Sequence, residues 1–400
     1  MRVYADRDES NIYLERQIRE WTQSGLLEPS QGASFLSEVR VEFRRTSIYL
    51  RVVLFIFSLL ISAAAVALVA ASSHLGDKTA GVLCIISGIV TFFMAEVLVR
   101  EFHFYRFGVE EGFAVLSAIF ISIGIGIATG LTFFGHGANT PLVLGITTGI
   151  VVSLAVYLRF GFLYVAAFAL VGLGLLAFQI ASTEAGKIGL AAAMLLAAAV
   201  IARILRKNSE REYLNEELGA IETMAIIGVY LVLNVHLQIG FHGGYSTLLR
   251  QQLSAGFYWF TYGAVWILPV IGLVISLREK HRLMILASLG MALATLSTNK
   301  PYLGREHQTW DLILFGLFLI GVAVAIKRWL ASGPGGYRHG YTASRLLHGD
   351  KQILAAVGTA AAALHGARVV SPSSPPHVAP PNSMQPGGGS SGGGGASGEF

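Results

Sequence analysis

Short polar segments that separate the long apolar runs of this sequence contain four histidines: His74, His136, His242 and His307. Asp77, Glu306 and Asp311 lie near them along the chain. Imidazole and carboxylate groups bind zinc and similar metals, and a histidine can also act as a general base. No two of the histidines have the i, i+4 spacing of a helical metal motif, so a shared site requires several loops to converge. Two interpretations stay open: a metal or catalytic site, and interfacial histidines without a ligand.

Acidic and polar residues within the apolar runs are few, and their depth decides what they can do. Glu96 and Glu222 lie near the ends of two runs, whereas a charged residue at the centre of a bilayer costs roughly 2.5 to 3.5 kcal/mol. We therefore expect both carboxylates to reach an interface or to pair locally rather than to carry protons. Asn234 and His236 lie near the opposite end of the run that contains Glu222.

Pro269 lies at the centre of another apolar run. It has no backbone N–H to donate and frees the carbonyl of Val265, so it predicts a kink that is either structural or part of a gate. A transport pathway would in addition need a polar cavity at mid-depth. The residues available to line one are Asn234, Tyr230, Thr147, Thr148, Ser58 and Gln179.

Composition places these residues in a membrane protein. Of 400 residues, 54% are hydrophobic and only 13% are charged, which is far from the balance of a water-soluble protein. The single cysteine, Cys84, excludes a disulfide framework and a thiolate metal cluster within the chain. The glycine-rich "GIGIGIATG" lies inside an apolar run with no strand before it, so it predicts no dinucleotide site, and no cofactor is expected.

A membrane-spanning helix needs about 20 apolar residues, and the sequence contains ten such runs. We predict spans over residues 52–72, 79–99, 113–134, 140–158, 161–181, 188–204, 219–239, 256–277, 281–298 and 309–326. The expected fold is all-α and polytopic, with a ten-helix transmembrane domain over 51–328.

Basic residues predict the orientation of these spans, because Lys and Arg are retained on the cytoplasmic side in short loops. With the N-terminus inside, sixteen Lys and Arg flank the inner ends and five lie in the outer loops. Both termini are therefore expected in the cytoplasm, and the four histidines on the outer face. The net charge of +5 is then a topology signal and indicates no nucleic-acid partner.

The segments outside the spans differ in character. Residues 1–50 predict a cytoplasmic helical hairpin and a basic linker, in which Gly25 ends one helix and Pro29 starts the next. Residues 329–370 predict a short cytoplasmic or interfacial helix. Residues 371–400 are rich in Pro, Ser and Gly and predict a disordered tail, either native or a linker added for expression.

The N-terminal stretch "LERQIREWTQSGLLEPSQGASFL", followed by paired apolar spans, resembles the bacterial membrane proteins grouped as domain of unknown function 2157. The residues that carry the resemblance are Trp21, Gly25, Leu26, Leu27, Gln31 and Leu36. It covers about the first 120 residues and departs from the family at the Glu-Pro-Ser before Gln31. The resemblance implies a bacterial inner-membrane protein and supplies no catalytic residues.

Three functions fit these observations. The first is a non-enzymatic scaffold or interaction protein, in which the hairpin or the C-terminal tail binds other proteins while the spans contact lipid. The second is a transporter or flippase of an uncharged or lipid-like solute, consistent with the uncharged midplane and Pro269. The third is a membrane enzyme that uses the outer histidines and acids. A packed interior favours the first, a polar central cavity the second, and convergence of the histidines the third.

Overall fold

Helices make up almost all of the described chain. The computed structural model describes residues 2–23, 25–39, 43–72, 76–130, 139–237, 253–279 and 281–303, with short stretches between 316 and 342. The predicted tail, most of the segment 329–370 and most of the tenth predicted span lie outside these residues. Two short strands, β1 (Tyr337–Arg338) and β2 (Tyr341–Thr342), form an antiparallel pair.

Eight described helices are long and apolar enough to cross a membrane. They are α3 (Ile48–Ser72), α4 (Asp77–Arg100), α5 (Val109–Ala128), α6 (Asn139–Phe160), α7 (Leu163–Ile180), α8 (Glu184–Lys207), α12 (Ala255–Glu279) and α13 (Arg282–Tyr302). The helix α9 (Glu212–Leu233) begins and ends earlier than the seventh predicted span, 219–239, and overlaps most of it. Glu216, Glu217 and Glu222 make its first half too acidic for it to count among the eight. The predicted all-α polytopic fold is confirmed.

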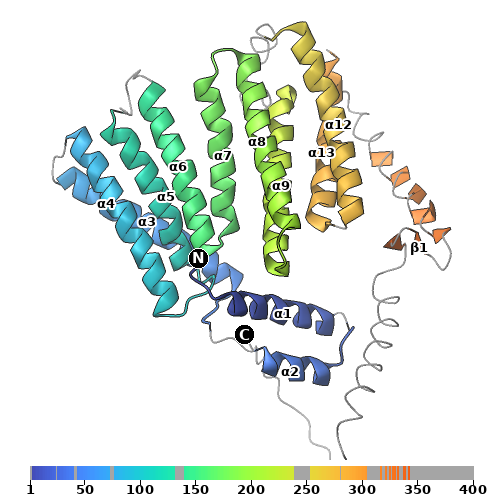
Figure 1. Cartoon of the computed structure of the whole chain (residues 1–400), viewed down its shortest axis with the longest axis horizontal. Coiled ribbons are helices and arrows are strands. Elements are labelled where there is room, and N and C mark those ends of the chain that lie inside the picture. The colour runs from blue at the N-terminus through green and yellow to red at the C-terminus, as the bar shows by residue number, and fades with distance from the viewer. Residues whose placement is uncertain are drawn as a thin grey trace, which may run out of the picture. The chain divides into compact units, whose positions relative to one another are not determined.

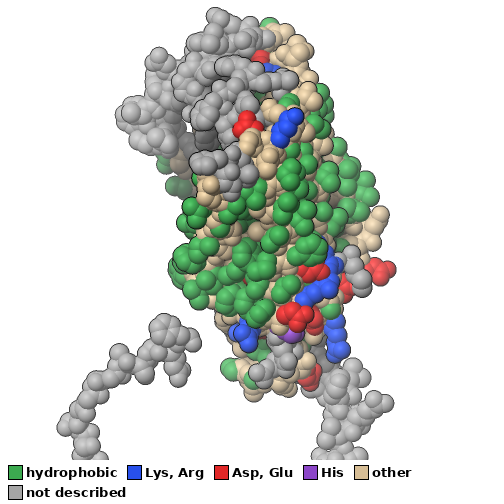
Figure 2. All heavy atoms as spheres, turned by 90° about the vertical axis from the view of Figure 1, so that its left-hand side faces the viewer, with side chains coloured by type: hydrophobic (Ala, Val, Ile, Leu, Met, Phe, Trp, Pro, Cys, Tyr) green, Lys and Arg blue, Asp and Glu red, His purple; other side chains and the backbone are tan. Residues whose placement is uncertain are grey.

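Side chains sort by type along these helices. In the face shown in Figure 2, hydrophobic side chains cover the middle of the described surface, and most charged side chains gather at its lower end. Large apolar residues such as Phe57, Phe93 and Leu158 are 60–65% exposed, which in water would be unfavourable over so large an area. Lipid is the solvent that suits this surface.

The predicted N-terminal hairpin is confirmed as a helical element. It consists of α1 (Asp6–Gln23) and α2 (Pro29–Glu38), and Gly25 joins them with a φ of 69°, the left-handed conformation that glycine adopts without strain. The two helices pack so closely that a Cβ on Gly32 would lie 2.3 Å from Thr22 Oγ1. In Figure 1 the hairpin lies below the ends of the long helices, and we call this the hairpin end of the bundle.

From α4 to α9, each helix packs against the next, and α4 and α5 meet through glycines. A Cβ on Gly81 of α4 would lie 2.5 Å from the backbone N of Ala128, and one on Gly124 of α5 would lie 2.8 Å from Gly81 O. This is small-residue packing of the kind found between membrane helices. Buried apolar residues form one cluster among α7, α8, α9, α12 and α13, and another where Tyr4 meets the hairpin ends of α4 to α7.

Candidate functional site

The four histidines that predicted a metal or catalytic site all lie outside the described residues, so their convergence stays a prediction: His74, His136, His242 and His307. Among the residues that are described, no group of three or more His, Cys, Asp or Glu side chains could hold a metal ion.

Glu96 and Glu222 both lie in ion pairs, as expected for acids near the ends of spans. Glu96 of α4 contacts Arg100 one turn along the same helix, at 2.6 Å, and Arg159 of α6. The Glu222 side chain is only 2% exposed, and its two oxygens lie 3.2 Å from Arg203 Nη1 and 3.1 Å from Arg206 Nη2 of α8. Both carboxylates therefore have positively charged partners at the hairpin end.

The Glu222 pairs belong to a cluster that joins three helices. Glu279, near the end of α12, also contacts Arg203 and Arg206. His281 lies between α12 and α13. Burial is the main cause that lowers the pKa of its imidazole, and the positive charge of Arg206 lowers it further. Because two guanidinium groups bridge two carboxylates, this cluster ties α8, α9 and α12 together.

Asn234 and the carbonyl of Val265, one turn before Pro269, take part in one buried hydrogen-bond network. Asn234 ends α9 and donates through Nδ2 to Tyr230 OH at 3.0 Å and to Thr298 Oγ1 at 3.1 Å. Tyr230 OH lies 3.0 Å from Thr295 Oγ1, which in turn lies 3.0 Å from Val265 O. Pro269 was predicted to free that carbonyl, and Thr295 supplies it with a hydrogen-bond partner.

His236 lies beside this network. Its Nε2 atom is 2.9 Å from Tyr258 OH, and its ring meets that of Tyr302 edge-on at 4.3 Å. Asn234 is fully buried and Tyr230 is 1% exposed. The polar residues predicted as candidates for a transport pathway at this depth are therefore packed against each other.

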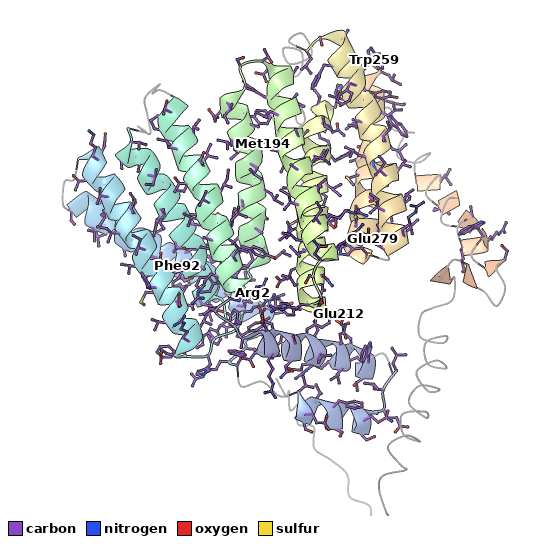
Figure 3. All side chains as sticks on the ribbon, viewed as in Figure 1. Arg2, Phe92, Met194, Glu212, Trp259 and Glu279 are labelled. Atoms are coloured by element: carbon purple, nitrogen blue, oxygen red, sulfur yellow. The ribbon has the colours of Figure 1, made fainter. Side chains whose placement is uncertain are left out.

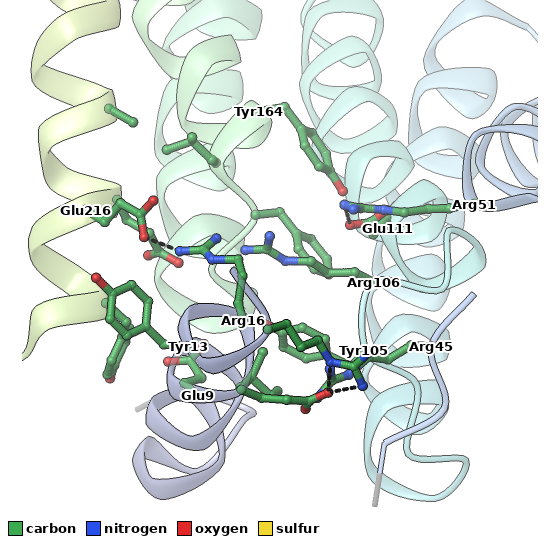
Figure 4. Close-up of a pocket in the computed structure, with 18 of the residues that line it drawn as sticks. Glu9, Tyr13, Arg16, Arg45, Arg51, Tyr105, Arg106, Glu111, Tyr164 and Glu216 are labelled. Atoms are coloured by element: carbon green, nitrogen blue, oxygen red, sulfur yellow. Dashed lines mark hydrogen bonds and ion pairs between the residues drawn. The ribbon is translucent and has the colours of Figure 1, made fainter. Parts of the chain in front are cut away.

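A charged cavity at the hairpin end was not predicted. It has a volume of about 600 Å³ and lies between α1 and the ends of α3, α5, α7, α9 and α13. Figure 4 shows arginines, glutamates and tyrosines pointing into it from several of these elements. We call it the hairpin cavity.

Arg2 fastens α1 over the hairpin cavity. Its Nη1 atom donates to both oxygens of Glu9, at 3.0 and 2.9 Å, and its Nη2 atom donates to Glu217 of α9 at 2.5 Å. The guanidinium also lies over the rings of Tyr157 and Tyr213, at 5.9 and 5.6 Å from their centroids. Figure 3 shows Arg2 between α1 and the ends of the long helices.

The charges of this fastening are largely withdrawn from solvent. The Arg2 side chain is 12% exposed, that of Glu9 7% and that of Glu217 16%. Burial raises the pKa of the Glu9 carboxyl, and Arg2 opposes that rise. Further along the chain, Val3 N donates to Arg159 O at 2.8 Å, so the backbone is held as well.

The carboxylates that line the hairpin cavity are all paired with guanidinium groups. Besides Glu9 and Glu217 on Arg2, the ion pairs are Glu15 with Arg19 and Arg45, Glu111 with Arg51, and Glu216 with Arg16. Arg106 also lines the cavity and, among the described residues, has no carboxylate partner. Its guanidinium lies 5.6 Å from the centroid of the Tyr105 ring.

Fold and site together define the class: an all-α polytopic membrane protein with a helical hairpin fastened over a charged cavity at one end of its bundle. Comparisons with protein-family models, curated proteins and solved structures found no match. The resemblance to domain of unknown function 2157 therefore stays a prediction.

Proposed function

We propose that this protein is a non-enzymatic membrane protein that holds the α1–α2 hairpin at the membrane surface, where it binds cytoplasmic proteins. The observation that carries the proposal is the Arg2 fastening, which fixes α1 to the bundle through Glu9 and Glu217. A fixed hairpin presents its outer residues in one orientation, which lowers the entropy lost on binding.

Large apolar side chains of both hairpin helices remain partly exposed. Phe35 of α2 is 46% exposed, and Leu14 of α1 is 40% exposed. Aromatic side chains of this kind are enriched in protein interfaces. The expected partner is a cytoplasmic protein that offers apolar side chains to them.

The excess of Lys and Arg at the inner ends of the predicted spans supports a cytoplasmic hairpin. In our proposal both termini lie in the cytoplasm and the bundle lies in a bacterial inner membrane, as the N-terminal resemblance implies. Maleimide labelling of single cysteines tests this orientation after Cys84→Ala. A Ser37→Cys site in α2 should be protected in intact cells, and a Thr183→Cys site at the other end of the bundle should be labelled.

The transporter alternative receives less support from the described bundle. Asn234 and Tyr230 are buried and hydrogen-bonded to each other and to α13, which favours a packed region over an aqueous pathway there. The enzyme alternative depends on the four outer histidines, which are outside the described residues.

Photo-crosslinking in native membranes tests the hairpin as a binding surface. A photoreactive phenylalanine analogue in place of Phe35 should give a discrete adduct with a cytoplasmic protein. The matched control replaces Phe93 of α4, which is 60% exposed on the lipid-facing part of the bundle and should react with lipid alone. A protein adduct at both positions or at neither, or solute flux through vesicles that contain the purified protein, would contradict the proposal.

A further inference from the structure

Arg106 gives the hairpin cavity a positive charge that its lining carboxylates do not balance. The lining contains five arginines and five glutamates, and Arg2 also contacts two of those glutamates. Every one of these glutamates is bonded to an arginine other than Arg106. A partly buried guanidinium needs anionic acceptors to compensate for its lost hydration.

Tyr164 supplies a second unmatched donor in the same cavity. Its hydroxyl oxygen is buried and has no hydrogen-bond partner. Nearly all buried hydroxyl groups in folded proteins are hydrogen-bonded, so an orphaned one needs an explanation. In Figure 4 the hydroxyl of Tyr164 lies beside the Arg51–Glu111 pair, and the guanidinium groups of Arg106 and Arg16 point toward the middle of the cavity.

The backbone around Arg106 is held in a conformation that directs its side chain inward. Arg106 has a φ of 52° and His103 one of 55°, values that are uncommon for residues with a side chain. Backbone hydrogen bonds of Arg44 to both sides of this loop, at 2.9 and 3.2 Å, hold it in place. Strained conformations of this kind are concentrated at ligand-binding sites.

We infer that the hairpin cavity binds a phosphate group, held by Arg106 and the hydroxyl of Tyr164. A phosphate offers several acceptor oxygens, and guanidinium groups bind it bidentately. The side chains of Arg16 and Glu216 are each 50% exposed, so their ion pair can break and leave Arg16 to contact another oxygen of the phosphate. Two sources present this chemistry, a phospholipid headgroup and a free phosphorylated small molecule. The inference is independent of what binds the hairpin.

Two variants test the inference on the full-length protein. Arg106→Gln removes the unmatched charge, and Tyr164→Phe removes the unmatched hydroxyl while leaving the ring packed. The control is Arg100→Gln, because Arg100 is a 57% exposed arginine that pairs with Glu96 and does not line the cavity. Tyr164→Phe should raise the thermal stability of the protein without ligand, since it removes an orphaned polar group.

Two probes separate the two sources. In phosphatidylcholine nanodiscs, inorganic phosphate should raise the melting temperature of the wild-type and Arg100→Gln proteins but not of Arg106→Gln if the ligand is a free phosphate. If the ligand is a headgroup, native mass spectrometry from nanodiscs doped with phosphatidylglycerol should show a retained lipid that both cavity variants lose at least tenfold. Equal responses of wild type, Arg106→Gln and Tyr164→Phe to both probes would overturn the inference.

Discussion

Replacing Arg2 with alanine should release α1 from the bundle. The change leaves Glu9 and Glu217, whose side chains are 7% and 16% exposed, without the guanidinium that now bridges them. Removing one partner of a buried ion pair costs about 3–5 kcal/mol, and the partial exposure of these groups lowers our expectation to about 2–4 kcal/mol. At about 1.4 kcal/mol for each factor of ten, the docking equilibrium should shift by roughly 30-fold to 700-fold.

Hydrogen–deuterium exchange of α1 measures this shift directly. In Arg2→Ala, amides of α1 should exchange faster by a comparable factor, while those of α8 should not change. Arg7→Ala is the matched control, since Arg7 is an exposed arginine of α1 that forms no ion pair within the described residues. Adding Glu9→Gln and Glu217→Gln to Arg2→Ala should restore part of the protection by removing the stranded charges. Exchange of α1 in Arg2→Ala that matches Arg7→Ala would refute the role of Arg2.

Three further changes probe the bundle. Thr295→Val removes the hydroxyl that donates to Val265 O and should destabilise the protein by about 1–3 kcal/mol in a thermal melt. The control Ser297→Ala removes an exposed hydroxyl that bonds within its own helix and should have little effect. Equal losses of stability in the two variants would contradict the role of the buried hydrogen-bond network. Burial lowers the pKa of His281, so its stabilising contribution is present above about pH 6.5 and is lost as the pH falls through the folded-state pKa. The melting temperature of His281→Gln should therefore depend less on pH than that of the wild type between about pH 7.5 and 5. Gly81→Val should separate α4 from α5 and reduce the folded yield on gel filtration, whereas a normal yield would contradict the close contact.

Features that depend on residues close together in the sequence were predictable from it. Apolar length located the spans, because a helix in lipid must satisfy its own backbone groups. Gly25 and Pro29 predicted the hairpin for the same local reason, since each favours one backbone conformation. Pro269 predicted a free carbonyl at Val265, and Thr295 is the side chain that contacts it.

The hairpin cavity could not be predicted, because its residues come from segments far apart in the chain. Arg2 meets Glu217 across 215 positions, and no local pattern encodes that contact. One signal was present: Glu110 and Glu111 open α5 with two acids that must be accommodated at the edge of an apolar helix. The predicted third span began at residue 113 and excluded them. Glu111 forms an ion pair with Arg51, and both residues line the hairpin cavity. The two acids were therefore a sequence signal for a charged site at this end of α5.

The central claim is that α1 lies fastened across the hairpin end of the bundle in the native membrane. Asp6 Oδ1 is 2.6 Å from Arg211 Nη1, so a short bismaleimide should crosslink Asp6→Cys to Arg211→Cys in the Cys84→Ala background. Glu20→Cys, about 21 Å further along α1 at 1.5 Å per residue, is the matched partner that should not react. Efficient crosslinking of the first pair alone is the predicted result, and equal crosslinking of the two pairs, or none, would contradict the account.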